Sequence, residues 1–84
     1  MEEYLGVIKL FAGTYCPENY MYCDGQTLQI SQYNALYAIL GTQYGGDGRV
    51  TFNLPTLNKV PFYQGTYLKY MICMVWLGYS TVYL

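Results

Sequence analysis

The side chains that could carry out acid–base chemistry are few and scattered. The chain has no histidine, which removes the commonest general base and the commonest metal ligand. No two of its carboxylates stand at a spacing typical of acid–base catalysis: Glu2, Glu3, Glu18, Asp24 and Asp47. We therefore expect no catalytic site, no cofactor and no metal, and we expect that the protein is not an enzyme.

The cysteines do not form a recognisable metal or disulfide pattern. Cys16, Cys23 and Cys73 are odd in number and none stands in a CxxC spacing. A Cys16–Cys23 bridge across a tight turn stays open, whereas composition favours buried free thiols. A nucleophilic cysteine would need a lysine or a helix N-terminus beside it, and nothing in the sequence marks such a place.

The densest glycine cluster, Gly45-Gly46-Asp47-Gly48, resembles a phosphate-binding loop only superficially. Such a loop continues into Gly-Lys-Ser/Thr and a helix, and neither follows here. Three glycines in four positions instead indicate positive φ angles or close approach by another segment. We expect a tight structural turn in which Asp47 hydrogen-bonds to the local backbone.

Composition points to a surface that other chains cover. Charged residues make up 11% of the chain, against about 25% in ordinary domains. Twelve tyrosines are present, and tyrosine is enriched at interfaces because it joins a large contact area to a polar tip. The cations are dispersed along the chain, which argues against a nucleic-acid partner: they are Lys9, Arg49, Lys59 and Lys69. We expect an oligomer or an assembly component.

Eighty-four residues are enough for one small domain, 1–84, with a marginal core. Its first half contains three segments with the composition or alternation of strands: Leu5–Phe11, Tyr20–Cys23 and Thr27–Ile30. Ala12–Glu18 is expected to be a loop. Asp24-Gly25 is the strongest short-range hairpin signal in the chain and predicts a hairpin at that point.

One helix is expected over Ser31–Leu40, ending at Gly41. Ser31 is a suitable N-cap, and Gly41 occupies the C′ position, where left-handed geometry is common. The predicted apolar face consists of Leu36, Ile39 and Leu40, with Tyr33 and Tyr37 beside it. Such a stripe is typical of a core or an interface.

In the second half, Val50–Phe52 is expected to be a short strand and Val60–Phe62 an extended segment. Tyr63–Thr66 is a predicted turn. Tyr67–Leu77 is the longest apolar run and predicts a central strand buried on both faces, with Ser80–Leu84 as a terminal edge strand. The apolar stretch from Tyr70 onward is too short and too interrupted to span a bilayer, so we expect no membrane insertion.

At this level of detail the chain resembles the phage tail collar domain family, which includes short tail-fibre proteins and the microcystin-dependent-protein group. The resemblance covers about the first 60 residues, in order and with the usual spacings. It is carried by Gly6–Gly13, Pro17, Cys23-Asp24-Gly25-Gln26, Leu28, Ile30, Ser31, Ala35-Leu36, Gly41-Thr42, Tyr44–Gly48 and Phe52-Asn53-Leu54-Pro55. Tyr70–Cys73 is similar to the closing strand of many members.

The resemblance implies an α+β fold: a small, β-rich collar-type domain in which one short helix, about 31–41, packs on short strands. The collar motif would span 5–62 and the closing strand 67–77, followed by the edge strand 80–84. It implies a non-enzymatic role in a tail fibre, a baseplate or a phage-like injection apparatus. The expected partners are copies of the chain itself, as a trimer, and other tail or baseplate proteins. The expected location is the virion tail, after synthesis in the host cytoplasm.

Three departures from the family pattern limit what carries over. Leu54–Pro61 reads LPTLNKVP, one residue shorter than the usual family segment and without its glycine. Some fibre members bind a metal through histidines, and this chain has none, so no metal carries over. Long members place a variable segment before the closing strand, where this chain has only Tyr63–Thr66.

Two functional hypotheses follow from the sequence. The first is a structural virion component, and the alternative is a free-standing, soluble cytoplasmic binding module: a small oligomer that holds a small molecule or a host protein. The residues expected to shape the structural motif are Asp24, Gly25, Gly41, Gly45, Gly46, Asp47, Gly48, Phe52, Leu54 and Pro55. The candidate interface residues are Tyr33, Tyr37, Tyr44, Tyr63 and Trp76.

Overall fold

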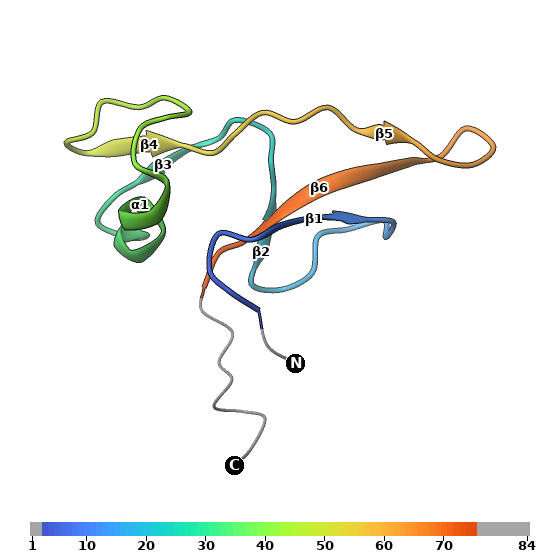
Figure 1. Ribbon diagram of the computed structural model, residues 1–84, viewed down its shortest axis with the longest axis horizontal. Helices are drawn as coiled ribbons and strands as arrows, with labels where there is room; N and C mark the ends of the chain where they lie inside the picture. Colours follow the sequence, from blue (N-terminus) through green and yellow to red (C-terminus); the bar gives the residue numbers. More distant parts are fainter. Residues whose placement is uncertain (1–2, 76–84) are drawn as a thin grey trace, which may run out of the picture.

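The computed structural model describes residues 3–75 of the chain. Short strands and one short helix alternate along these residues (Figure 1). In chain order the elements are β1 (Ile8–Phe11), β2 (Tyr20–Tyr22), β3 (Thr27–Gln29), α1 (Asn34–Leu40), β4 (Thr51–Asn53), β5 (Val60–Pro61) and β6 (Tyr67–Cys73). The predicted β-rich α+β class with one short helix is confirmed.

Strand β6 is the centre of the larger sheet. It pairs antiparallel with β1, where Ile8 faces Ile72, and with β2, where Met21 faces Ile72. Its first residues pair instead with β5, where Val60 faces Leu68. The prediction of a central strand is thus confirmed, although it ends at Cys73 and the predicted residues beyond 75 lie outside the described part.

Burial along β6 differs from the prediction. Met71, Ile72 and Cys73 are buried, but the four residues from Tyr67 to Tyr70 are not. Strand β2 pairs only with the buried residues 71–73, and β1 pairs with residues 69–72. The first two residues, Tyr67 and Leu68, pair only with the two-residue β5. Burial on both faces therefore applies to half of the strand. The predicted edge strand 80–84 lies outside the described residues.

A second, two-stranded sheet joins β3 to β4, with Leu28 opposite Phe52. Leu28 is buried and its neighbours Thr27 and Gln29 are exposed, which confirms the predicted alternation. Helix α1 lies against this sheet in Figure 1 and supplies Leu36 and Leu40 to the interior.

One hydrophobic core connects the two sheets and the helix. Its buried members are Cys23, Leu28, Leu36, Leu40, Phe52, Leu54, Ile72 and Met74. Phe52 from β4 is fully buried, and its ring lies 5.4 Å from that of Tyr37 between centroids. Burying one such side chain contributes about 1.5–3 kcal/mol. Because Ile72 reaches the same cluster from the larger sheet, neither sheet has a core of its own.

The helix begins later than its sequence signals predict. It starts at Asn34, with Tyr33 in the N-cap position and no side-chain cap, so the assignment of Ser31 as N-cap is wrong. Residues 30–33 form turns instead, tied by Gln32 and Tyr33 N–H groups to the Gln29 carbonyl. Ile39, predicted on the apolar face, is 54% exposed. The turn takes up the four residues between β3 and α1, so the helix has only seven residues, about two helical turns.

The Asp24-Gly25 dipeptide does not form a hairpin. Strand β2 pairs with β6 and strand β3 pairs with β4, so this dipeptide lies where the chain passes from one sheet to the other. Its backbone is satisfied by a distant segment: the Gly25 N–H donates to the Pro55 carbonyl at 3.1 Å, and Asp24 forms a bridge with Thr56. Long-range partners therefore override the local turn signal.

Beyond Asn58 the chain leaves the body as a hairpin, which we call the arm (residues 59–68). The predicted turn Tyr63–Thr66 is confirmed as its end, closed by hydrogen bonds from the Thr66 N–H to the Tyr63 carbonyl (2.9 Å) and from the Phe62 N–H to the Thr66 carbonyl (3.0 Å). Gln64 and Gly65 have φ angles of 47° and 81°, as a type I′ turn requires. In Figure 1 the arm projects away from α1 and the smaller sheet.

Candidate assembly surface and structural turn

The glycine turn lies against β4 because its backbone has no side chains in the way. Gly45, Gly46 and Gly48 have φ angles of 124°, 98° and 76°. A Cβ atom on Gly46 would lie 2.4 Å from the Cα of Phe52 and 2.7 Å from the carbonyl oxygen of Thr51. Both reasons for glycine that the sequence suggested, positive φ and close approach, therefore hold at Gly46.

Asp47 holds this turn together. Its Oδ1 atom accepts hydrogen bonds from the N–H groups of Arg49, Val50 and Thr51 at 2.8, 2.9 and 2.9 Å. These three hydrogen bonds, led by the one from Thr51, hold the pKa of the Asp47 carboxyl far below its usual range. A phosphate would need just such N–H groups, and here a carboxylate of the chain itself occupies them. The expected local role of Asp47 is confirmed.

The other residues of the predicted motif meet between the sheets. Phe52 and Leu54 are buried in the core, and Pro55, also buried, accepts the Gly25 hydrogen bond described above. Gly41 ends α1 at φ 60° and ψ −147°, which differs from the left-handed helical geometry expected there. That combination is open to glycine and costly for other residues.

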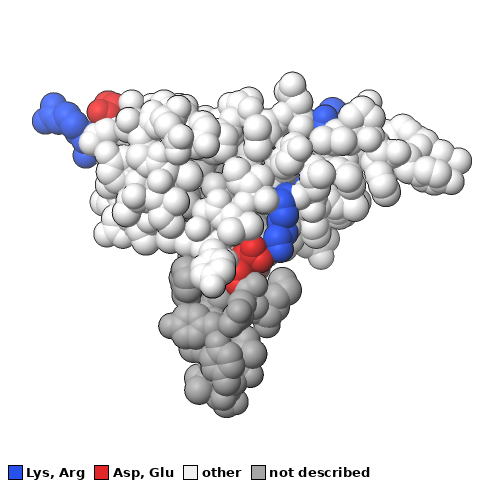
Figure 2. All heavy atoms as spheres, viewed as in Figure 1, with Lys and Arg blue, Asp and Glu red and all other residues white. Residues whose placement is uncertain are grey.

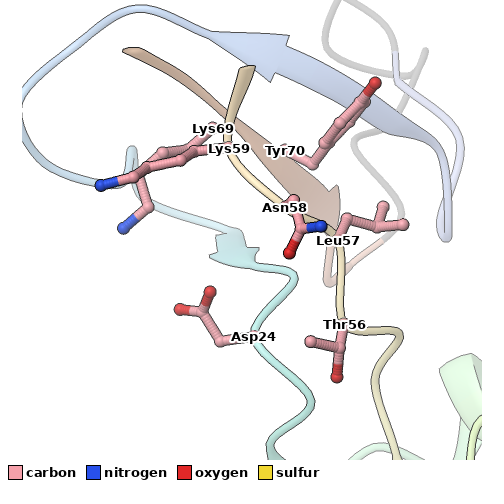
Figure 3. Close-up of a pocket in the computed structure, with 7 residues that line it drawn as sticks. All are labelled: Asp24, Thr56, Leu57, Asn58, Lys59, Lys69 and Tyr70. Carbon is pink, nitrogen blue, oxygen red and sulfur yellow. The ribbon is translucent and has the colours of Figure 1, made fainter. Parts of the chain in front are cut away.

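Asp24 lines a pocket that gathers charged side chains of both signs (Figure 3). The pocket has a volume of about 300 Å³ and is lined by Asp24, Thr56, Leu57, Asn58, Lys59, Lys69 and Tyr70. In Figure 3 the Asp24 carboxylate extends to the side on which the ammonium groups of Lys59 and Lys69 lie. This set can offer charge and hydrogen bonds to a ligand, and it includes no serine, cysteine or histidine.

Each of the two lysines stands over a tyrosine ring. The Nζ of Lys59 is 4.3 Å from the ring centroid of Tyr67, and the Nζ of Lys69 is 4.1 Å from that of Tyr22. Neither makes an ion pair within residues 3–75, where Lys9–Glu3 is the single salt bridge, at 2.8 Å. The rings therefore partly compensate both charges, by about 0.5–1 kcal/mol each at an exposed site.

The three cysteines are free in the structure. Cys23 and Cys73 are buried and Cys16 is half-buried, so the expectation of buried free thiols holds fully for two of them. Burial raises the pKa of the Cys23 thiol to about 11 and also raises the pKa values of Cys16 and Cys73. At neutral pH these groups are protonated thiols and therefore weak nucleophiles.

The candidate interface tyrosines divide into two groups. Tyr33 and Tyr37 are half-buried against the core, and the Tyr37 hydroxyl donates to the Gly48 carbonyl at 3.3 Å, so they support the fold. Tyr44 and Tyr63 are exposed, at 44% and 63%. Trp76 lies outside the described residues.

The structure adds exposed residues that sequence reasoning did not select. Phe62 is 64% and Tyr15 is 77% exposed, and Tyr67 is exposed as well. Pro61 before Phe62, and Gly13 and Pro17 around Tyr15, are the signals of irregular surface segments that could have identified them. The large hydrophobic side chains exposed in the described part are Tyr4, Leu10, Tyr15, Ile39, Tyr44, Val50, Leu57, Phe62, Tyr63, Tyr67 and Val75.

Charge is sparse on the face shown in Figure 2, where coloured atoms occupy a few separate spots. Within the described residues no three potential ligands of the His, Cys, Asp or Glu type come together as a metal site. A search of the same residues for helices with the length and hydropathy of a membrane span finds none. The arrangement as a whole offers contact area rather than reactive groups.

Comparison with known families gives one match. The family model described as Phage Tail Collar Domain matches residues 6–60, from just before β1 to the first residue of β5. The matched region includes the glycine turn, the core strand β4 and α1, and it covers well over half of the chain. No curated protein and no solved structure matches the chain.

The close approach at Gly46 predicts a severe effect of a methyl group there. Gly46→Ala should lower the free energy of unfolding by clearly more than the roughly 1–2 kcal/mol that a positive φ angle alone costs, because the added Cβ meets backbone that cannot rotate away. Gly65→Ala is the matched control, since its φ is 81° but no atom lies within 4 Å of the added Cβ. Urea unfolding of both variants measures the difference, and equal losses would contradict the clash.

The hydrogen bonds to Asp47 predict a defined pH dependence. The folded-state pKa is depressed, so the carboxylate stabilises the fold above its unfolded pKa of about 3.9, and this contribution is lost as the pH falls below that value. Asp47→Asn should destabilise the protein at pH 7 and should flatten its loss of stability between pH 5 and pH 2. Asp24→Asn is the control, because the described residues donate no hydrogen bond to the Asp24 carboxylate. Denaturant midpoints across that range test the prediction, which fails if both variants follow the wild type.

Proposed function

The chain belongs to the phage tail collar domain family, and on that premise we propose that it is a non-enzymatic structural component of a tail fibre, a baseplate or a phage-like injection apparatus that assembles as a homo-oligomer. A role in the phage tail is what the family match gives directly. The observation that carries the proposal is the match itself, which runs through both sheets and the glycine turn. The homo-oligomer and its place in the tail are the proposed part.

The surface supports assembly into a larger particle. Eleven large hydrophobic side chains are exposed within residues 3–75, on a chain with nine charged residues among 84. Covering one such side chain contributes up to about 1.5–3 kcal/mol, so contact with further copies would stabilise this domain. The expected trimer rests on the family resemblance, and closed symmetric oligomers are the usual result of self-association.

The chemistry of the described residues supports a non-enzymatic role. The thiols have raised pKa values, the carboxylate with the strongly lowered pKa is used by its own turn, and the charged pocket includes no serine, cysteine or histidine. At an active site, side chains with strongly shifted pKa values usually converge on a cavity. Here Asp47, the carboxylate with the strongly lowered pKa, is part of the turn beside β4 and accepts hydrogen bonds from that turn.

A second candidate is a free-standing oligomeric binding module. The observation that favours it is the pocket of about 300 Å³ with Asp24, Lys59 and Lys69, a volume at the lower end of small-molecule sites. Its charges suit a small anion that also carries hydroxyl groups. In this role the protein would be soluble in the cytoplasm, with a small molecule or a host protein as partner.

The structural role predicts that the purified protein is an oligomer and a particle component. Light scattering at micromolar concentration should give a multiple of the 9.7 kDa chain mass, with three copies as the expected number. Mass spectrometry of purified tails or particles should detect the chain at a fixed ratio to other tail proteins. A monomer in solution would contradict the oligomer. Recovery only from soluble lysate, with a small molecule bound, would favour the binding module.

The short connection before β6 predicts weak recognition of host cells. Tyr63–Thr66 forms a single β-turn, which is too short to present a separate binding lobe. Purified protein mixed with whole host cells should therefore stay in the supernatant. Saturable cell binding, lost when residues 63–66 are replaced by alanine while the oligomer mass is unchanged, would instead identify a receptor-binding tip.

A further inference from the structure

The arm lacks the support that the rest of the fold has. None of the buried residues of the main core comes from residues 59–68. The arm is held by the pairing of β5 with β6, which involves only Val60 with Leu68 and Pro61 with Tyr67, and by its turn. An isolated two-stranded hairpin is marginally stable in water. A surface that covers the arm would therefore stabilise it.

The end of the arm is aromatic and fixed in shape. Phe62 and Tyr63 are both nearly two-thirds exposed, and their ring centroids lie 6.5 Å apart. The type I′ turn holds the backbone between them and Thr66 in one conformation. Rigid aromatic side chains bind with little loss of conformational freedom, and such residues are typical anchors of interfaces.

The arm and the segment beside it carry one sign of charge. Residues 57–70 contain Lys59 and Lys69 and no carboxylate. Both lysines stand over tyrosine rings and neither is part of a salt bridge in the described part of the chain. A partner with an apolar pocket and an unpaired carboxylate would match this arm in both respects.

The same chain presents such a pocket on the loop between β1 and β2. The pocket has a volume of about 440 Å³ and is lined by Phe11, Gly13, Thr14, Tyr15, Pro17 and Glu18. The Phe11 ring lies directly on the loop backbone, where a Cβ on Gly13 would be 2.4 Å from its Cε2 atom. Glu18 is exposed and forms no ion pair with the described residues. Apolar walls and one free carboxylate complement the aromatic, cationic arm.

Within one copy, the end of the arm does not lie at the β1–β2 loop pocket. The turn at the end of the arm projects past the β1–β2 loop in Figure 1, and strands β1 and β5 lie on opposite edges of β6. The two surfaces are therefore available to separate molecules. Because they differ, the contact is heterologous, and successive contacts of this kind can close into a ring.

We propose that the arm of one copy docks its Phe62–Tyr63 end into the β1–β2 loop pocket of a second copy, with Lys59 near Glu18 of that copy. The proposal rests on the homo-oligomer of the proposed function and names the surface that forms it. This contact accounts for the aromatic side chains of the arm, which contribute no buried residue to the main core.

A complementation experiment tests the docking directly. The arm variant Phe62→Ser with Tyr63→Ser keeps its pocket, and the pocket variant Tyr15→Ser with Glu18→Lys keeps its arm. Each should be monomeric by native mass spectrometry at a concentration where the wild type is fully associated. Mixed together they should form a two-chain complex and nothing larger, since each pair then has one intact contact. Ile39→Ser, which removes an exposed side chain from α1, should leave the wild-type mass unchanged.

The ion pair gives a second, finer readout. Lys59→Glu alone and Glu18→Lys alone should each raise the dissociation constant a few-fold at low salt, as expected for an exposed pair, and the chain with both changes should recover it. Salt at about 1 M should reduce these differences, because it screens exposed charges. Every changed residue is on the surface, so unfolding midpoints close to that of the wild type confirm that the variants fold.

The outcomes separate this inference from the proposed function. A monomeric wild type would contradict the homo-oligomer itself. A wild-type oligomer whose mass both variants retain would overturn the docking and leave the homo-oligomer standing. Arm variants that keep the wild-type oligomer mass but no longer enter particles would show that the arm contacts another tail protein. This result would also overturn the docking. A mixture that remains monomeric would likewise overturn it.

Discussion

The fold depends on the contact between the Gly46 backbone and the backbone of β4. This contact leaves no room for a side chain, and it holds the turn against the strand that carries Phe52. Phe52 in turn lies at the centre of the core that joins the helix and both sheets. The Asp47 carboxylate supplies the hydrogen-bond partner for three backbone N–H groups of the turn and the start of β4.

The region around β4 and the arm differ in how much of their surface is buried. In β4, Phe52 is buried, and the strand pairs with β3 and is hydrogen-bonded to the glycine turn, whereas the arm has pairing without a core. A domain of this size buries only about 60–65% of its unfolded surface, and the arm accounts for part of what is left exposed. Its aromatic residues lie where a second chain can cover them. Under the proposed docking, stability and assembly are provided by different parts of the sequence.

Local chemistry was predictable from the sequence wherever neighbouring residues determine it. The glycine turn, the role of Asp47 and the Tyr63–Thr66 turn follow from residue types within a few positions. Asp24-Gly25 failed as a hairpin signal because its hydrogen bonds go to Pro55 and Thr56, thirty residues away, which no local rule contains. Tyr37 and Tyr63 were both candidate interface residues, yet Tyr37 is half-buried against the core and Tyr63 is exposed. The structure was therefore needed to tell which tyrosines support the fold.

The central position of β6 has a consequence for how the protein is made. Its pairing partners β1 and β2 are translated first, and β6 is translated about fifty to sixty residues later. Until then both early strands have unpaired edges, which are liable to pair with other chains. Contacts of such long range also slow folding, because the intervening loop must close before they form. The larger sheet can be completed only after β6 has been synthesised. The short length of these strands and the charge of Lys9 on β1 limit edge-to-edge pairing during that interval.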